Sequence, residues 1–161
     1  MRIRRHSSAI TIMKIVVQRV NSASVRVDGR SVGEIGRGLL LLVGIERKDV
    51  QEQFPAAVKK ICEMRLFPDE KHERKFDRSL SDIQGELLIV SQFTLCADTT
   101  KGRRPDFFGA METAKAKELY HQLLEVFRGV IGPDRVACGE FGAYMQVTLE
   151  NDGPVTILLD M

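Results

Sequence analysis

Long hydrophobic runs and paired cysteines are both missing from this sequence of 161 residues. A membrane-spanning helix needs roughly 18 or more consecutive apolar residues, whereas the longest apolar run, Leu39–Val43, has only the length of a strand. Three cysteines, Cys62, Cys96 and Cys138, form no Cys-x-x-Cys pair, which argues against a disulfide framework or a zinc site. We therefore predict a cytoplasmic protein with reduced thiols, no membrane association and no bound metal ion.

The sequence also lacks the familiar catalytic motifs. Its three histidines are His6, His72 and His121, and none belongs to a His-Glu-x-x-His pattern; a phosphate-binding loop and a dinucleotide-binding glycine pattern are absent too. Ser91 is not part of the Gly-x-Ser-x-Gly turn that exposes the nucleophile of α/β-hydrolases. No cofactor is expected, and side-chain chemistry alone predicts no particular reaction.

Neither positive nor negative charge is in large excess. Lysine and arginine number 24 against 22 acids, so the formal net charge is only +2, and nothing global demands a polyanionic partner. One local basic run exists, Lys101-Gly102-Arg103-Arg104. On charge alone a solvated loop is the better interpretation of such a short run, with a phosphate-contacting loop as the alternative.

The length fits one domain with a hydrophobic core. Residues 1–12 differ from the rest, because they carry three arginines and a histidine but no acid, and a second methionine follows at Met13. They resemble a weak organelle-targeting peptide. Their shortness favours another explanation, a translation start upstream of Met13. We expect an N-terminal extension over residues 1–12 and a single domain over residues 13–161.

The pattern of apolar residues predicts an α+β fold. Alternation over 14–28, the hairpin signal Asp28-Gly29, a returning strand at 31–35 and a buried strand at 39–45 indicate an opening β-meander. A strong strand is expected over 86–97, and closing strands over 135–149 and 154–159, separated by a turn at 151–153. The expected sheet is largely antiparallel, curved or barrel-like, and covered by two main helices.

The two helices are expected over 49–64 and from Thr113 to the stop at Gly132-Pro133. Pro55 conflicts with a start at Asp49, so the first helix either begins nearer Gln53 or is kinked. Residues 68–84 are polar and indicate a loop or a weak edge hairpin, while 98–111 indicate a long basic loop.

Two segments stand out from this pattern. Ser91-Gln92-Phe93-Thr94-Leu95 places hydrogen-bonding residues in an otherwise buried strand, where a satisfied polar strand end is an equally good explanation. Asn151-Asp152-Gly153-Pro154-Val155-Thr156, taken alone, is better explained as a plain turn.

Together, in this order and at this distance, the two segments resemble the signature motifs of the D-aminoacyl-tRNA deacylases. The likeness extends from Met13 to Met161 and includes the opening residues 18–20, Gly33-Glu34-Ile35-Gly36, the loop 101–105 and residues 141–147. Cys96, Asp106 and Tyr144 depart from residues common in that family. None of the three lies in the residues that carry the signatures.

The resemblance implies a homodimer that hydrolyses D-aminoacyl-tRNA, and glycine mischarged on tRNA, with each active site at the subunit interface. Gly153-Pro154 of one subunit, joined by a cis peptide bond and supported by Arg19, would enter the partner's pocket and reject L-amino acids by main-chain contact.

The resemblance also assigns the catalytic segment to Ser91, Gln92, Phe93 and Thr94. Backbone amides near Phe93 and Thr94 would bind the ester carbonyl. The Thr94 hydroxyl would hydrogen-bond the substrate or, less favourably, act as nucleophile; alternatively the ribose 2′-hydroxyl of the tRNA assists the attacking water.

Phe141 and Met145 would line an adenosine pocket, and Lys101, Arg103 and Arg104 would contact tRNA phosphates. Two rivals stay open, an inactive nucleic-acid-binding or interaction protein on the same fold, and a generic esterase.

Overall fold

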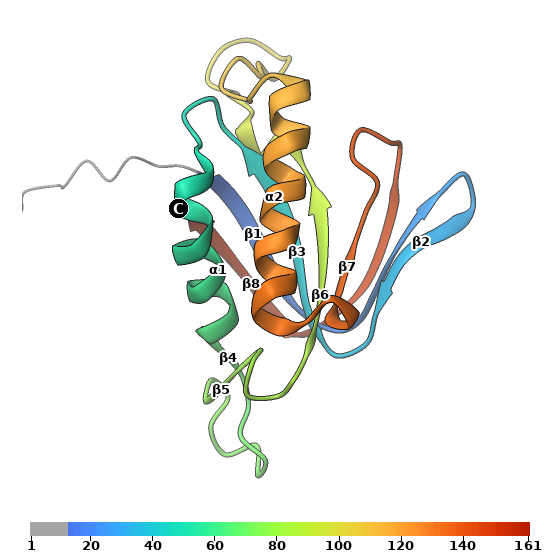
Figure 1. Cartoon of the computed structure of the whole chain (residues 1–161), viewed down its shortest axis with the longest axis vertical. Helices are drawn as coiled ribbons and strands as arrows, with labels where there is room; N and C mark the ends of the chain where they lie inside the picture. The colour runs from blue at the N-terminus through green and yellow to red at the C-terminus, as the bar shows by residue number, and fades with distance from the viewer. Residues whose placement is uncertain (1–12) are drawn as a thin grey trace, which may run out of the picture.

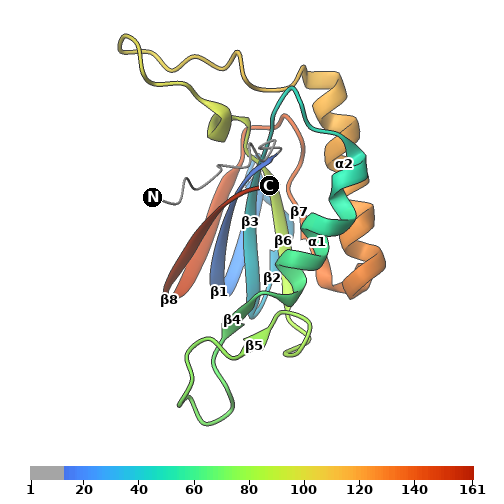
Figure 2. The ribbon, with the colours of Figure 1, turned by 90° about the vertical axis from the view of Figure 1, so that its left-hand side faces the viewer.

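The computed structural model describes residues 13–161, and the predicted extension over residues 1–12 lies outside the described residues. One curved sheet carries two helices on one face (Figures 1 and 2), and a small two-stranded sheet lies at its lower end. In chain order the elements are β1 (Met13–Val27), β2 (Arg30–Ile35), β3 (Gly38–Ile45), η1 (Gln51–Gln53), α1 (Phe54–Glu63), β4 (Arg65–Phe67), β5 (Arg78–Ser79), β6 (Glu86–Ser91), η2 (Phe93–Cys96), α2 (Thr113–Ile131), η3 (Pro133–Arg135), β7 (Val136–Cys138) and β8 (Gln146–Asp160).

The long strand β1 organises the sheet. Its first half pairs with β3 and its second half with β2, while β8 pairs with both halves from the other side. The register against β8 shifts between Gln18 and Ser22, where the strand changes partner. The predicted meander is therefore wrong in its pairing, because β3 adds to β1 and not to β2.

Two further pairings, β3 with β6 and β6 with β7, are parallel. Parallel neighbours need a crossover connection, and α1 and α2 provide these crossovers. The predicted α+β class, with a curved sheet and two covering helices, is confirmed. The parallel half of the sheet was not foreseen.

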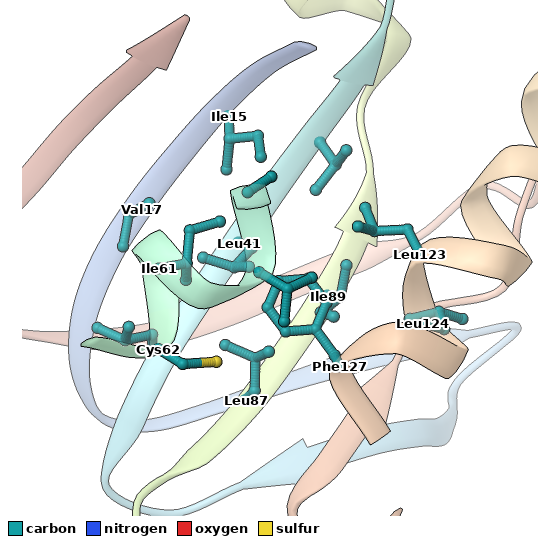
Figure 3. Packing of buried hydrophobic residues seen from close by; sticks show 14 of the residues in the cluster. Ile15, Val17, Leu41, Ile61, Cys62, Leu87, Ile89, Leu123, Leu124 and Phe127 are labelled. Carbon is teal, nitrogen blue, oxygen red and sulfur yellow. The ribbon is translucent and has the colours of Figure 1, made fainter. Parts of the chain in front are cut away.

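Hydrophobic side chains form a cluster on each side of the sheet. The larger cluster lies between the sheet and both helices, where Ile61 of α1 and Phe127 of α2 pack over sheet residues such as Leu41 (Figure 3). The second cluster, which includes Val20, Leu40 and Leu88, fills the inside of the curve. A β-carbon on Gly33 would lie 2.6 Å from the carbonyl oxygen of Cys138, so glycine lets β2 approach β7 and nearly close the sheet.

Three expected elements differ near their ends. The strand predicted over 86–97 stops at Ser91 and continues as the 3-10 turn η2. The helix predicted over 49–64 begins at Phe54, with Pro55 in its first turn, so the start nearer Gln53 is confirmed over the kinked helix. α2 starts at Thr113, and the residue before it, Glu112, is the cap, because its carboxylate accepts hydrogen bonds from the backbone amides of Ala114 and Lys115.

The closing strands also differ from the prediction. Residues 135–149 contain only the short β7 and an irregular segment before β8 begins at Gln146. Asn151–Gly153 do not separate two strands; they lie within β8, where the Asn151 side chain accepts a hydrogen bond from the Val155 amide at 2.7 Å and holds a local irregularity. None of the helices described between residues 13 and 161 is both long and apolar enough to cross a membrane.

Candidate active site

A cavity of about 680 Å³ opens where β3 and β6 end. Because these strands are parallel, their carboxyl ends meet at the same edge of the sheet. Val43 and Val90 contribute to its lining from the strands, and Ala116 from the first turns of α2. A cavity of this size is typical of a small-molecule site.

The predicted catalytic segment lies at this strand end. Ser91 is the last residue of β6 and lines the cavity together with Gln92 and Phe93. The Gln92 amide donates to the carbonyl oxygen of Val43 at 2.7 Å, and the chain then turns away as η2. This turn explains why Phe93 is 57% exposed and why the expected strand does not continue.

The turn presents a small set of polar groups. Phe93 and Thr94 are its first two residues, and the amides at the start of a helical turn have no partner within the turn. The side chain of the N-cap residue, Gln92, does not cap them. The Gln92 side-chain amide donates to the Thr94 hydroxyl oxygen at 2.5 Å, which orients both side chains. Thr94 itself is exposed and is not among the cavity residues.

Phe141 and Met145, the residues expected to line an adenosine pocket, line the cavity from the irregular segment after β7. Phe141 packs on Tyr120, with ring centroids 5.7 Å apart, and the Tyr120 hydroxyl donates to the carbonyl oxygen of Ile89 at 2.8 Å. These contacts tie the apolar wall to α2 and β6.

Sequence reasoning missed a further wall, which consists of Arg47, Phe107 and the residues near them. Arg47 lines the cavity, and its Cζ atom lies 3.9 Å from the centroid of the Phe108 ring. Phe107 meets Phe93 edge to face at 5.0 Å. A helix between two buried strands indicates a parallel crossover, which would have placed Arg47, just after β3, beside Ser91 at the end of β6.

Gly153 and Pro154 do not line this cavity. Both are exposed, and the peptide bond between them is cis. Arg19, only 8% exposed, donates to the carbonyl oxygen of Asp152 at 2.8 Å and to that of Leu66 at 2.6 Å.

The register of the sheet shows that Gly153-Pro154 lies far from the catalytic segment. Arg19, which contacts Asp152, pairs with Leu39 of β3, whereas Ser91 pairs with Val43 of the same strand. Four residues along a strand span about 13 Å. A single chain therefore does not bring Gly153-Pro154 and the catalytic segment together.

The predicted phosphate contacts, Lys101, Arg103 and Arg104, are exposed and lie outside the cavity. Backbone hydrogen bonds between Asp98 and Asp106 close the base of their loop. Figure 2 shows this loop extending past the sheet on the side opposite to the helices. The loop therefore projects into the solvent near the cavity.

Ionisable groups around the cavity are poor candidates for a general base. Glu112 lines it, but hydrogen bonds from the Ala114 and Lys115 amides hold the pKa of its carboxyl below the usual value, and a weak base results. Burial, assisted by nearby Glu46 and Asp49, raises the pKa of the Cys96 thiol to about 11, so the thiolate is scarce at neutral pH. Within residues 13–161 no group of three or more His, Cys, Asp or Glu side chains is placed to hold a metal ion.

Fold and site together define an α+β domain whose cavity has a backbone turn at its edge, and among residues 13–161 the ionisable groups near it offer no good side-chain base. The model of the D-Tyr-tRNA(Tyr) deacylase family matches residues 16–160, and the chain therefore belongs to this family.

Relatives of known name agree with this assignment. A D-aminoacyl-tRNA deacylase from Lactobacillus helveticus is 51% identical over 92% of this chain and 100% of its own length. A protein of the same name from Thermosipho melanesiensis is 49% identical over 92% of this chain and 97% of its own. A solved structure of the c-Myc DNA Unwinding Element Binding Protein is 46% identical, with a TM-score of 0.87 over 92% of this chain and 98% of that one.

Proposed function

We propose that this protein hydrolyses the ester bond of D-aminoacyl-tRNA and releases a free D-amino acid and tRNA, and that it acts in the same way on glycyl-tRNA. One observation carries the proposal: the uncapped backbone amides of Phe93 and Thr94 start a turn at the cavity edge. Amides fixed in this way can bind the oxyanion that develops on an ester carbonyl.

The proposed chemistry needs no side-chain base. An aminoacyl ester is already activated, so stabilising the developing oxyanion supplies much of the catalysis. The ribose 2′-hydroxyl of the terminal adenosine then assists the attacking water, while Thr94, held by Gln92, hydrogen-bonds the substrate. Phe141 and Met145 bind the adenosine against the apolar wall of the cavity.

The proposed active site needs two subunits. Gly153-Pro154 is exposed and separated from the catalytic segment of its own chain, which supports insertion into the cavity of a partner. Val16 pairs with both Leu42 and Leu158, so the three share the sheet face away from the helices. Leu158 is 77% exposed, which supports an apolar contact between subunits there. Sedimentation that shows a stable, fully active monomer would contradict this arrangement.

Handedness is the sharpest test of the proposed function. A thousandfold preference for the D ester requires about 4 kcal/mol of differential transition-state free energy. An adaptable apolar pocket supplies only about 1–3 kcal/mol per methylene, whereas a rigid main-chain clash penalises the wrong enantiomer directly.

The experiment compares D-tyrosyl-tRNA, glycyl-tRNA and L-tyrosyl-tRNA under identical conditions. We expect rapid hydrolysis of the first two and sparing of the third. Equal rates on the two tyrosyl esters would refute both the main-chain mechanism and the function. A generic esterase would instead hydrolyse small activated esters without any tRNA.

A second candidate function is nucleic-acid binding without catalysis. The projecting loop with Lys101, Arg103 and Arg104 favours it, and the 46% identical c-Myc DNA Unwinding Element Binding Protein is named for binding DNA. Tight duplex DNA binding by a chain that leaves D-tyrosyl-tRNA intact would establish this alternative. As a deacylase, the protein is proposed to act in the cytoplasm, where charged tRNA is used.

A further inference from the structure

An exposed aromatic ring and a stacked arginine lie at the rim of the cavity. Phe108 is 72% exposed, and the Arg47 guanidinium covers one face of its ring at 3.9 Å. Arg47 lines the cavity, whereas Phe108 lies just outside it. The pair therefore connects the inside of the cavity with the surface.

The two side chains are held in place by the loop around them. The Arg47 Nε atom donates to the carbonyl oxygen of Ala110 at 3.3 Å. The Arg47 backbone amide donates to the carbonyl oxygen of Gly109 at 3.1 Å. The Asp106 carboxylate accepts a hydrogen bond from the Phe108 amide at 2.6 Å. The ring is thus held at the surface, and its second face is open to a ligand.

Charge near the pair favours an anionic ligand. None of the ion pairs found among residues 13–161 involves Arg47, so its charge is available to a phosphate. Lys101, Arg103 and Arg104 extend the positive surface along the same loop. The start of α2 is a poorer phosphate site, because the Glu112 carboxylate already occupies its amides.

We propose that the Arg47–Phe108 pair binds the nucleotide that precedes the terminal adenosine of the substrate. The base stacks on the open face of Phe108, and the connecting phosphate lies beside the Arg47 guanidinium. This inference rests on the proposed function, since an adenosine in the cavity requires the preceding nucleotide to leave through its mouth. Stacked aromatic rings combined with basic side chains are the usual means of binding single-stranded nucleic acid.

The test compares two substrates that differ only in the nucleotides before the adenosine, D-tyrosyl-tRNA and D-tyrosyl adenosine. Base stacking on an aromatic side chain contributes about 1–3 kcal/mol per base. We expect Phe108→Ala to lower the ratio of kcat/KM on the tRNA to kcat/KM on the adenosine ester by about tenfold, mainly through KM. Phe108→Trp should preserve the ratio because it keeps a stacking surface. Arg47→Gln should lower it and weaken its dependence on salt.

Val130→Ala is the matched control, because Val130 is an exposed apolar side chain at the far end of α2. A Phe108→Ala ratio equal to that of the control would overturn the proposal, and so would equal losses on both substrates, which indicate a local structural role. If the unmodified protein hydrolyses neither ester, both the stacking proposal and the proposed function are refuted. If it hydrolyses both esters and Phe108→Ala leaves the ratio unchanged, only the stacking proposal is refuted.

Discussion

Arg19 binds Asp152 in two ways: its Nε atom donates to the Asp152 carbonyl oxygen at 2.8 Å and lies 3.3 Å from the Asp152 carboxylate. A second nitrogen of the same guanidinium donates to the Leu66 carbonyl oxygen. One nearly buried side chain thus joins residue 152 of β8 to the middle residue of β4. The turn proposed to enter the partner subunit depends on this contact.

Arg19→Ala should destabilise the fold. The change leaves three backbone carbonyl oxygens, those of Asp152, Leu66 and Lys75, without their charged donor. We therefore expect the free energy of unfolding to fall by about 2–4 kcal/mol. Arg19→Lys should recover part of the loss, because an ammonium keeps the charge but not the planar fork. Urea unfolding of the three proteins measures the effect. An unchanged midpoint in Arg19→Ala would show that the contact contributes nothing.

Thr94→Val should reduce activity only moderately. The change removes the oxygen that accepts from Gln92 but leaves the backbone amides in place. We expect a loss in kcat below about 100-fold, whereas removal of an essential nucleophile costs about 10⁴-fold or more. Single-turnover deacylation of D-tyrosyl-tRNA distinguishes the two. A loss of the larger size would make Thr94 the nucleophile.

Gly44→Ala should displace the catalytic turn. A β-carbon at Gly44 would lie 3.0 Å from both the Gln92 carbonyl oxygen and the Leu95 Cβ atom, so η2 must move by a few tenths of an ångström. Small displacements of positioned groups are costly in catalysis, and we expect about a tenfold loss in kcat. Gly36→Ala is the control, since its β-carbon would meet nothing nearer than 3.7 Å. Equal kcat in the two variants would argue against a catalytic role for the turn.

Asp49 should make stability fall as pH rises. Burial raises the pKa of this carboxyl from 3.8 to about 8, and its Oδ1 atom has no hydrogen-bond partner among the described residues. Between these values the folded state holds a proton that the unfolded state has released. The free energy of unfolding should therefore decrease with pH by up to about 1.4 kcal/mol per unit.

Asp49→Asn tests this assignment, because an amide cannot ionise. Urea unfolding at several pH values between 4.5 and 8 should show a flatter dependence in the variant than in the unmodified protein. Identical slopes would mean that another group binds the proton.

Replacing Lys101, Arg103 and Arg104 with alanine should weaken tRNA affinity more than kcat. Each phosphate contact that is lost should reduce the slope of log affinity against log salt by roughly 0.7–0.9. Lys59→Ala with Lys60→Ala on α1 is the control for general charge. If the triple variant binds tRNA with unchanged affinity and salt slope, the loop is only a solvated surface.

Local patterns predicted the elements whose residues alternate or repeat regularly. Alternation predicted β1, the hairpin signal Asp28-Gly29 predicted the return as β2, and the stop at Gly132-Pro133 predicted the end of α2. The boundary at Ser91 could not be read in the same way, because Phe93 and Leu95 continue an apolar alternation while the backbone has already turned. The Gln92 amide still donates to Val43 of the neighbouring strand, but the Leu95 amide donates back to the Gln92 carbonyl oxygen at 3.2 Å and closes the turn.

In the candidate site, too, some residues could be predicted from the sequence and others could not. Ser91, Gln92, Phe93, Phe141 and Met145 were predicted through the family resemblance, and the structure gathers them around one cavity. Arg47 and Phe107 were missed because their place depends on the parallel pairing of β3 with β6, which a meander excludes. Long-range pairing, and not residue type, determines which loops share a cavity.

The continuity of β8 has a consequence for solubility. Among residues 13–161 this strand of 15 residues pairs with β1 alone, so its other side is a long open edge. Such edges invite pairing with further chains and promote aggregation, and natural proteins interrupt them with proline or charge. Pro154, in the middle of β8, has no backbone N–H to offer, and Glu150 and Asp160 add a charge on each side of it along the strand. The proline proposed to read substrate handedness also interrupts this strand, and we expect the interruption to limit pairing with further chains.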